Sequence, residues 1–243
     1  MIFDAFLYNG EKELLEIRLN ETCLLGDWVT TVLVEANKTH TGNDKELHFE
    51  KHKTDFSRFN IMYFVVEDMP ENATAKEREI YQRNKISEAL NFLSPKDDDT
   101  VIISDVDEIP RTAQLNKFHG IDFAALIMDK YAYGLNILES EQSWDRARAM
   151  SYRYLRNKTP NEVRDSGYDF SLHHAGWHYS WICDPLNKLQ SFSHTEFDNQ
   201  ENIEKIENKE NFWNDDELTK IEINLSHPEY LYKNQDKFKH LIL

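Results

Sequence analysis

Cysteine, glycine and proline are scarce in this chain of 243 residues. The two cysteines, Cys23 and Cys183, are too few for a disulfide framework and lie in no metal-binding spacing, so we expect two buried thiols. The seven glycines and six prolines form no flexible or Pro-rich linker, and no repeat of fixed period occurs. The sequence therefore predicts one continuous domain and excludes a disulfide scaffold or a repeat array.

Long hydrophobic runs are also missing. No segment approaches the ~18 consecutive apolar residues of a membrane-spanning helix. The N-terminal segment MIFDAFLYNG has neither the basic start nor the apolar stretch of a signal peptide. We therefore expect a cytoplasmic protein without a signal, a membrane anchor or a transmembrane segment.

Basic residues are the third deficit. The chain has 28 Lys and Arg against 44 Asp and Glu, which gives a formal net charge of −16. This sign opposes broad binding to phosphate backbones, so we expect no nucleic-acid partner. An anionic substrate must instead meet a local group of cations or a bound metal ion.

What the sequence does contain is an alternation of apolar strands and amphipathic helices. This order predicts an α/β fold with a mainly parallel central sheet and helices on both faces. Ligands bind beyond the carboxyl ends of such strands, so the loops after Ala36, Val66 and Ser104 should line the site. Strands are expected at residues 2–8, 28–36, 61–66, 100–104, 123–128 and 147–154, and helices at 11–24, 74–93, 184–190 and 199–211.

Three carboxylates directly follow the strand expected at 100–104. Asp105, Asp107 and Glu108 lie within four residues, so their mutual repulsion needs compensation. A divalent cation would supply it, because hard oxygen ligands on a short turn suit Mg²⁺ or Mn²⁺. The alternative is a solvated acidic turn that ends at Pro110.

The segment around this turn, VIISDVDEIPR (101–111), resembles the Asp-x-Asp segment of glycosyltransferase family 17. Similar segments occur in the family's order over residues 2–198. They are FDAFLYNGEKELLEIRLNE (3–21), VLVEANKTHTG (32–42), Gln82-Arg83-Asn84, Gly176-Trp177-His178 and KLQSFSHTEF (188–197).

The resemblance implies a GT-A type, Rossmann-like nucleotide-sugar fold. It also implies a metal-dependent, inverting transfer of N-acetylglucosamine from UDP-GlcNAc to a glycan hydroxyl, with Mn²⁺ or Mg²⁺ as cofactor. A metal ion held by Asp107, with Asp105 in support, would offset the negative charge that develops on the UDP leaving group. His194 is the best-placed third metal ligand, and a structural histidine is the alternative.

The resemblance also suggests residues that bind the donor. Glu35 and His40 belong to the second strand and its loop, where such folds hold the nucleoside. Arg83, beside Asn84 on a helix, could reach the diphosphate or the acidic turn, or it could pair with Glu79 four residues earlier.

The second half of the chain adds a cation and aromatic residues to this set. Lys188 could balance phosphate charge, and the family motif directs Trp177 and His178 towards the site. Trp177 offers a ring face for sugar C–H groups, although core packing is the alternative. The aromatic reserves for this role are Trp181, Tyr179 and Tyr133.

An inverting transfer needs a base that takes the proton of the acceptor hydroxyl. We favour Glu196, which is close in sequence to His194, and take Asp184 as second choice. A surface glutamate and a helix cap before Pro185 are the respective alternatives.

The single domain 1–243 then divides into three parts. We expect a nucleotide-binding half (2–120), an acceptor and catalytic half (121–198) and a C-terminal helical extension (199–243). Animal members of the family carry an N-terminal anchor and a stem, so a chain without them is expected to be a bacterial or viral type of enzyme. Its partners would be a nucleotide-sugar donor and a glycan or other glycoconjugate acceptor.

Two other functions fit parts of the sequence. VIISDVDEI could be a haloacid-dehalogenase-type phosphatase motif with Asp105 as nucleophile and Asp107 as acid/base. That motif normally opens its domain, whereas here it lies beyond residue 100. The third possibility is a non-catalytic module that binds a nucleotide or a sugar.

Overall fold

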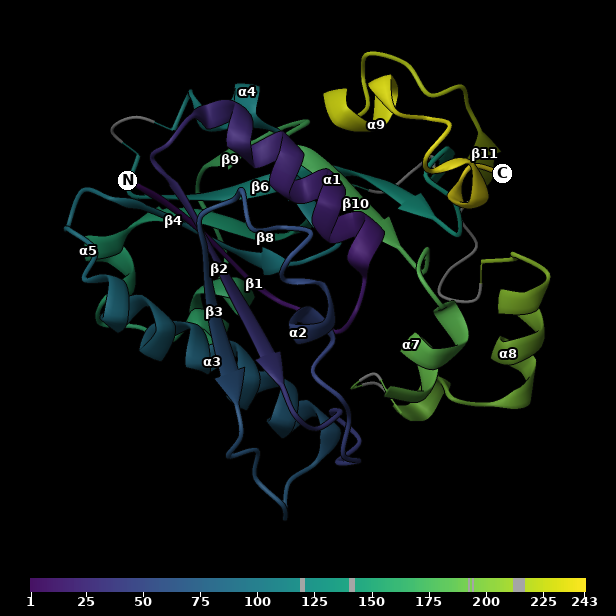
Figure 1. Cartoon of the computed structure of the whole chain (residues 1–243), viewed down its shortest axis with the longest axis horizontal. Coiled ribbons are helices and arrows are strands. Elements are labelled where there is room, and N and C mark those ends of the chain that lie inside the picture. Colours follow the sequence, from purple (N-terminus) through teal and green to yellow (C-terminus); the bar gives the residue numbers. More distant parts are fainter. Residues whose placement is uncertain (119–120, 140–142, 192, 194, 212–216) are drawn as a thin grey trace.

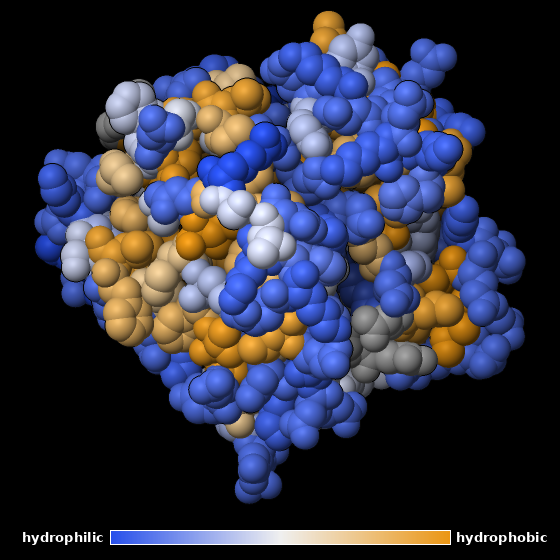
Figure 2. All heavy atoms as spheres, viewed as in Figure 1, coloured by the Kyte–Doolittle hydropathy of each residue, from blue (hydrophilic) through white to orange (hydrophobic). Residues whose placement is uncertain are grey.

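The computed structural model describes residues 1–118, 121–139, 143–191, 193, 195–211 and 217–243. Figure 1 shows a central sheet with helices packed around it and with α7 and α8 beside it. The architecture is an α/β fold, as predicted. Hydrophilic residues cover most of the face in Figure 2, while hydrophobic side chains gather mainly in its left half.

Four parallel strands form the first half of the sheet, in the order β3-β2-β1-β4. Every residue of β2 is buried, as expected for a strand that is covered on both faces. Because the strands are parallel, their carboxyl ends meet at one edge of the sheet. The strands are β1 (Ile2–Leu7), β2 (Val29–Ala36), β3 (Ile61–Val66) and β4 (Thr100–Asp105).

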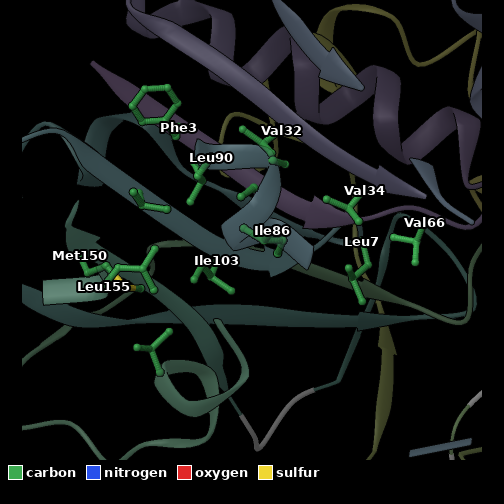
Figure 3. Packing of buried hydrophobic residues seen from close by; sticks show 14 of the residues in the cluster. Phe3, Leu7, Val32, Val34, Val66, Ile86, Leu90, Ile103, Met150 and Leu155 are labelled. Atoms are coloured by element: carbon green, nitrogen blue, oxygen red, sulfur yellow. The ribbon is translucent and has the colours of Figure 1, made fainter. Parts of the chain in front are cut away.

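Helices cover both faces of this parallel block. On one face, α3 (Ala75–Leu93) packs Ile86 and Leu90 against alternate residues of the strands, as Figure 3 shows. On the other face, α1 (Lys12–Thr22) packs Leu15 and Leu19 against β1 and β2. The predicted layering is therefore confirmed.

Helix α3 begins where its sequence provides a capping box. The Thr74 hydroxyl accepts a hydrogen bond from the backbone N–H of Glu77, and the Glu77 carboxylate accepts one from the backbone N–H of Thr74. These contacts satisfy two N–H groups that lack a partner within the helix. The cap fixes the start of the helix that carries Arg83 to the carboxyl edge of the sheet.

The second half of the sheet is mixed. The strand β8 runs antiparallel to β4, and β6 runs antiparallel to β8. β10 then pairs parallel to β6 and antiparallel to β5, and β9 also pairs with β6. The bounds are β5 (Glu108–Pro110), β6 (Phe123–Ala132), β7 (Ile137–Glu139), β8 (Trp144–Ser151), β9 (Ser171–Leu172), β10 (Gly176–Ser180) and β11 (Leu218–Lys220).

Several boundaries in this half differ from prediction. β8 ends at Ser151, and α5 (Tyr152–Leu155) occupies the end of the strand expected at 147–154. The predicted helical extension also contains a strand, because β11 pairs with β7. The remaining helices are α2 (His48–His52), α4 (Thr112–Leu115), α6 (Pro160–Asp165), α7 (Pro185–Ser191), α8 (Gln200–Glu207) and α9 (Glu229–Lys233), with short 3₁₀ turns η1 (Cys23–Leu25), η2 (Thr195–Phe197) and η3 (Lys239–Leu241).

The structure bears on the expected lack of a membrane span and on the two cysteines. None of the helices in the described ranges is long and apolar enough to cross a membrane. The expectation of two buried thiols is wrong, because Cys23 is exposed on η1 and Cys183 is half-buried. Cys23 lies at the end of α1, on a turn that the core does not cover.

Candidate active site

A cavity of about 520 Å³ opens at the carboxyl edge of the parallel strands. Its walls come from the ends of β1, β2 and β4, from α3 and α6, and from β6, β10 and α7. Among its described lining residues, eight are Lys or Arg and six are Asp or Glu. The cavity therefore carries more cations than carboxylates although the chain is strongly acidic, which suits an anionic ligand.

Arg18 of α1 fixes the backbone of the acidic turn after β4. This arginine is fully buried and forms an ion pair with buried Asp4 of β1, with distances of 2.8 Å and 2.5 Å. Its remaining donors reach the backbone carbonyls of Asp105 and Glu108, each at 2.7 Å. The buried charge thus fixes the backbone of the turn that presents the carboxylates.

Glu108 is a structural carboxylate of this turn. It is fully buried, accepts a hydrogen bond from the backbone N–H of Asp105 at 2.9 Å, and binds the Arg164 guanidinium at 2.6 Å and 2.7 Å. The indole N–H of Trp144 also donates to it at 2.5 Å. Because of these contacts, Glu108 cannot serve as an open metal ligand and instead positions Arg164 and Trp144.

Asp105 lies between two arginines. Arg83 of α3 donates to one carboxylate oxygen at 2.6 Å, and Arg164 of α6 donates to the other at 2.7 Å. Burial raises the pKa of Asp105, but the Arg164 and Arg83 guanidinium groups outweigh burial and hold the pKa well below its ordinary value. Asp105 is therefore ionised at neutral pH.

Asp107 lies deeper in the same wall and meets a different cation. Its carboxylate accepts a hydrogen bond from Lys188 Nζ of α7 at 2.6 Å, and His178 Nε2 of β10 is 3.9 Å away. Burial again raises the pKa of Asp107, and the Lys188 ammonium and His178 lower it further than burial raises it. Burial also lowers the pKa of His178, so its imidazole is neutral at pH 7.

Asp105 and Asp107 are the carboxylates of this turn that would hold a metal ion. Lys188 contacts one oxygen of Asp107, whereas Arg83 and Arg164 contact both oxygens of Asp105, so Asp105 would bind a metal ion only by exchanging one of these contacts. Both line the cavity and both are ionised, and Mg²⁺ or Mn²⁺ usually takes one or two carboxylates and completes its shell with water and phosphate. No group of three His, Cys, Asp or Glu comes together in the part of the chain that the structure describes. The predicted third ligand, His194, lies outside the described residues.

The loop after β2 and helix α3 line the other end of the cavity. His40 Nε2 is 2.9 Å from Gln82 Oε1, and burial lowers the pKa of His40. Arg83 combines both roles considered for it, because it contacts Asp105 and also donates to Glu79 at 2.7 Å. Its Nε atom is buried and has no hydrogen-bond partner among the residues that the structure describes. His40 and Arg83 are thus in the cavity wall, as the sequence suggested.

Glu35 is not in the cavity wall, contrary to the expectation from its strand. The carboxylate is fully buried and accepts hydrogen bonds from the backbone N–H groups of His48 and Phe49, from Lys45 Nζ and from the Tyr63 hydroxyl, all within 3.1 Å. Its role is to hold the segment after β2 and the start of α2. Glu35 therefore acts on the site only through that segment.

Asn84 and Trp177 also serve packing rather than the cavity. The Asn84 side chain accepts a hydrogen bond from the backbone N–H of Asn161 at 3.0 Å, which joins α3 to α6. Trp177 is 2% exposed, donates to the Ser226 carbonyl at 2.8 Å and packs under Arg111. Trp177 is therefore a core residue, which was the alternative to sugar binding.

The two candidates for the catalytic base are close in sequence to lining residues such as Lys188 and Ser193, but they do not line the cavity themselves. Asp184 is exposed, and its backbone carbonyl accepts a hydrogen bond from the N–H of Lys188 at 3.0 Å. Glu196 is exposed on η2, shortly after Ser193, whose hydroxyl donates to Glu79 at 2.5 Å. Both candidates flank α7, the helix that brings Lys188 to Asp107.

The structure brings further residues into the site that the sequence did not single out. Arg164 donates to both Asp105 and Glu108 of the acidic turn, and Trp144 stacks on His178 with ring centroids 4.2 Å apart. The Lys130–Glu139 ion pair and Glu11 also line the cavity. Of the three predicted loops, the one after Val66 contributes no described lining residue.

Comparison with known proteins agrees with this architecture. The profile of glycosyltransferase family 17 matches residues 1–213. The chain is 24% identical to the β-1,4-mannosyl-glycoprotein 4-β-N-acetylglucosaminyltransferase of Rattus norvegicus, over 99% of this chain and 54% of the relative. It is 25% identical to the Homo sapiens enzyme of the same name, over 76% of this chain and 41% of the relative. The chain thus spans about half the length of these relatives.

The solved structures that this chain matches include two glycosyltransferases, both at low structural similarity. The galactosyltransferase LgtC, in complex with donor and acceptor sugar analogs, has a TM-score of 0.37 at 10% identity, covering 99% of this chain and 95% of that chain. GlyE of Streptococcus pneumoniae has a TM-score of 0.34 at 11% identity, covering 86% of this chain and 42% of that chain.

Fold, cavity and family match together define the class of protein. The chain has an α/β fold with a charged cavity at the carboxyl ends of its parallel strands. It belongs to glycosyltransferase family 17. This membership replaces the phosphatase alternative drawn from the sequence.

Proposed function

We propose that this chain transfers N-acetylglucosamine from UDP-GlcNAc to a glycan hydroxyl, with inversion and with Mn²⁺ or Mg²⁺ as cofactor. The observation that supports this most is the pair of ionised carboxylates, Asp105 and Asp107, in a cavity whose wall is otherwise rich in cations. The names of the family relatives support N-acetylglucosamine as the sugar. The acceptor class is a glycan or another glycoconjugate.

The residues of the chain divide the work between them. Asp107 and Asp105 would hold the metal ion, which supplies electrostatic stabilisation of the UDP leaving group when bound. Lys188 and Arg83 add fixed positive charge beside these carboxylates, where the phosphates of the donor would lie. Arg18 and Glu108 hold the turn in place, so the charges are arranged before the substrate arrives.

The nucleoside would occupy the end of the cavity formed by β1, β2 and α3. His40, which is neutral at pH 7, and Gln82 present hydrogen-bonding groups there. Glu196 is our first proposal for the base that deprotonates the acceptor, and Asp184 is the second. Both flank α7, the helix that brings Lys188 to Asp107.

The release of UDP from UDP-GlcNAc in the presence of Mn²⁺ tests this function without knowledge of the acceptor. Asp107→Asn should lower the rate by about 100-fold or more, because the variant loses the charge that holds the cation at the leaving group. Asp98→Asn is a matched control, since Asp98 precedes β4, at the opposite edge of the sheet, and is 84% exposed. Equal rates for wild type and Asp107→Asn would contradict the proposal.

A further inference from the structure

Two aromatic residues in the cavity wall have a backbone conformation that bulky L residues rarely adopt. Tyr133 directly follows β6 and Trp181 directly follows β10, and their φ angles are +62° and +57°. The two strands are parallel neighbours, with Ser180 in register with Ala132, so the two aromatic residues lie side by side at the same edge of the sheet. A glycine would adopt these angles without strain.

Strained backbone of this kind is found mainly where a ligand site requires it. Both residues line the cavity, and each keeps 8% of its surface exposed. The left-handed conformation turns an aromatic side chain away from the face of the sheet that the alternation of its strand would give it. Within β10 itself, Trp177 and Tyr179 face the core, whereas His178 and Ser180 line the cavity.

Polar groups accompany the aromatic pair. Lys130 of β6 and Glu139 of β7 form an ion pair at 2.6 Å, and both are less than one-tenth exposed although they line the cavity. Ser180 and Asn211 line the cavity too, and the Asn211 amide donates to Glu139 at 3.4 Å. Aromatic faces beside charged and amide groups match a pyranose ring, which has an apolar C–H face and a rim of hydroxyls.

The position of this group relative to the carboxylates indicates which sugar it would hold. In the sheet order β2-β1-β4-β8-β6, Asp105 and Asp107 at the end of β4 lie between His40 and Tyr133. Lys188 links the two regions, because its Nζ is 2.6 Å from Asp107 and 5.4 Å from the ring centroid of Trp181. A nucleoside near His40 and phosphates near Asp107 leave the aromatic end of the cavity for the acceptor.

We propose that Tyr133 and Trp181, together with the Lys130–Glu139 pair, form the subsite for the pyranose ring of the acceptor. This assignment rests on the proposed function and adds the acceptor's place and chemical class. It also replaces Trp177 as the aromatic residue that contacts sugar, because Trp177 does not line the cavity, whereas Tyr133 and Trp181 line it from the edge of the core cluster that they share with Leu189 and Ile206. The subsite selects a pyranose with an uninterrupted C–H face.

Saturation-transfer NMR on the full chain tests this subsite with methyl α-D-mannopyranoside and methyl N-acetyl-β-D-glucosaminide as probes, each with and without UDP and Mn²⁺. In the wild type, at least one probe should receive saturation at its ring C–H protons. Trp181→Leu, which keeps an apolar side chain but removes the ring, should weaken binding of that probe by about ten-fold. Trp181→Phe should bind within about three-fold of wild type, because it keeps an aromatic face.

Two further variants make the comparison specific. Tyr133→Leu should weaken binding as Trp181→Leu does, which guards against an effect of misfolding at one position. Trp28→Leu is the matched control and should leave binding unchanged, because Trp28 is 64% exposed and is not among the residues of the cavity wall.

Three outcomes would overturn the subsite. The first is that neither probe receives saturation in the wild type, and the second is that wild type and both leucine variants bind the probe equally. The third is that a non-cleavable UDP-sugar analogue displaces the probe, which would assign this place to the donor sugar. The proposed function has a separate outcome. A wild type that binds a pyranoside through Trp181 but neither binds UDP nor cleaves UDP-GlcNAc would contradict that function and not the sugar subsite.

Discussion

The two halves of the sheet contribute to the site in different ways. The parallel half, β3-β2-β1-β4, has mainly apolar strands of six to eight residues and delivers the carboxylates at the end of β4. The mixed half combines two long strands, β6 and β8, with short ones, and with α6 and α7 it delivers Arg164, His178 and Lys188 to those carboxylates. The parallel half thus fixes the framework and the carboxylates of the turn, each half with its helices supplies four of the eight lining cations, and the mixed half supplies Tyr133, Trp144 and Trp181.

The largest expected effect separates the chemistry of the two halves. Glu196→Gln should lower transfer by about 100-fold or more, because an amide cannot accept the acceptor proton, while UDP binding stays at the wild-type level. Turnover is measured with UDP-GlcNAc and a glycan acceptor, and UDP binding by titration. Turnover near that of wild type would remove Glu196 from the mechanism and move the assignment to Asp184.

Replacing Arg18 tests the framework that holds the acidic turn. Arg18→Met should lower the free energy of unfolding by about 3–5 kcal/mol, because it leaves the buried Asp4 carboxylate without its partner. The change is measured by urea unfolding. Arg153→Met is the matched control with a much smaller loss, since its pairs with Asp98 and Asp122 are exposed. Similar losses for both variants would contradict a special role of Arg18.

A smaller effect, the dependence of stability on pH, tests the contacts of Glu79 with Arg83 and Ser193. Burial raises the pKa of Glu79, but the Arg83 guanidinium and the Ser193 hydroxyl outweigh it and lower the pKa to about 2. Because this pKa is lower in the folded than in the unfolded chain, the stabilisation is present above pH 4.5 and is lost as the pH falls towards 2. By this linkage, Glu79 contributes about 3 kcal/mol at neutral pH.

Urea unfolding of wild type and Glu79→Gln across this pH range measures the effect. The difference in unfolding free energy should be largest at pH 7 and should shrink between pH 4.5 and 2. Lys76→Gln serves as control, because it removes the exposed partner of Glu79 and should change stability little at any pH. A difference between wild type and Glu79→Gln that does not vary with pH would contradict the shifted pKa.

The sequence predicted the parallel half well because its signals are local. Apolar runs, the capping box before α3 and the carboxylates directly after β4 can each be seen within a few residues. The contact of Arg83 with Asp105 was one of its predicted options, because a helix that follows a strand can return to the same edge of the sheet.

The rest of the site depends on tertiary contacts that no local pattern encodes. Arg164 lies 59 residues from Asp105 in sequence; the capping box of Thr159 and Glu162 marks the start of its helix but not the contact of that helix with Asp105. Trp177 was assigned to the site because the sequence does not show which face of β10 is buried, and a shift of one residue exchanges the two faces. Glu35 was assigned to the site because a buried carboxylate that holds a loop cannot be distinguished in sequence from one that binds a ligand.

A calorimetric titration of UDP, with and without Mn²⁺, tests the central claim most directly. The account predicts that Mn²⁺ strengthens UDP binding to the wild type and that this gain disappears in Asp107→Asn. The same UDP affinity in the wild type with and without Mn²⁺, or an undiminished Mn²⁺ effect in Asp107→Asn, would contradict the claim that the carboxylates after β4 bind a sugar nucleotide through a metal ion.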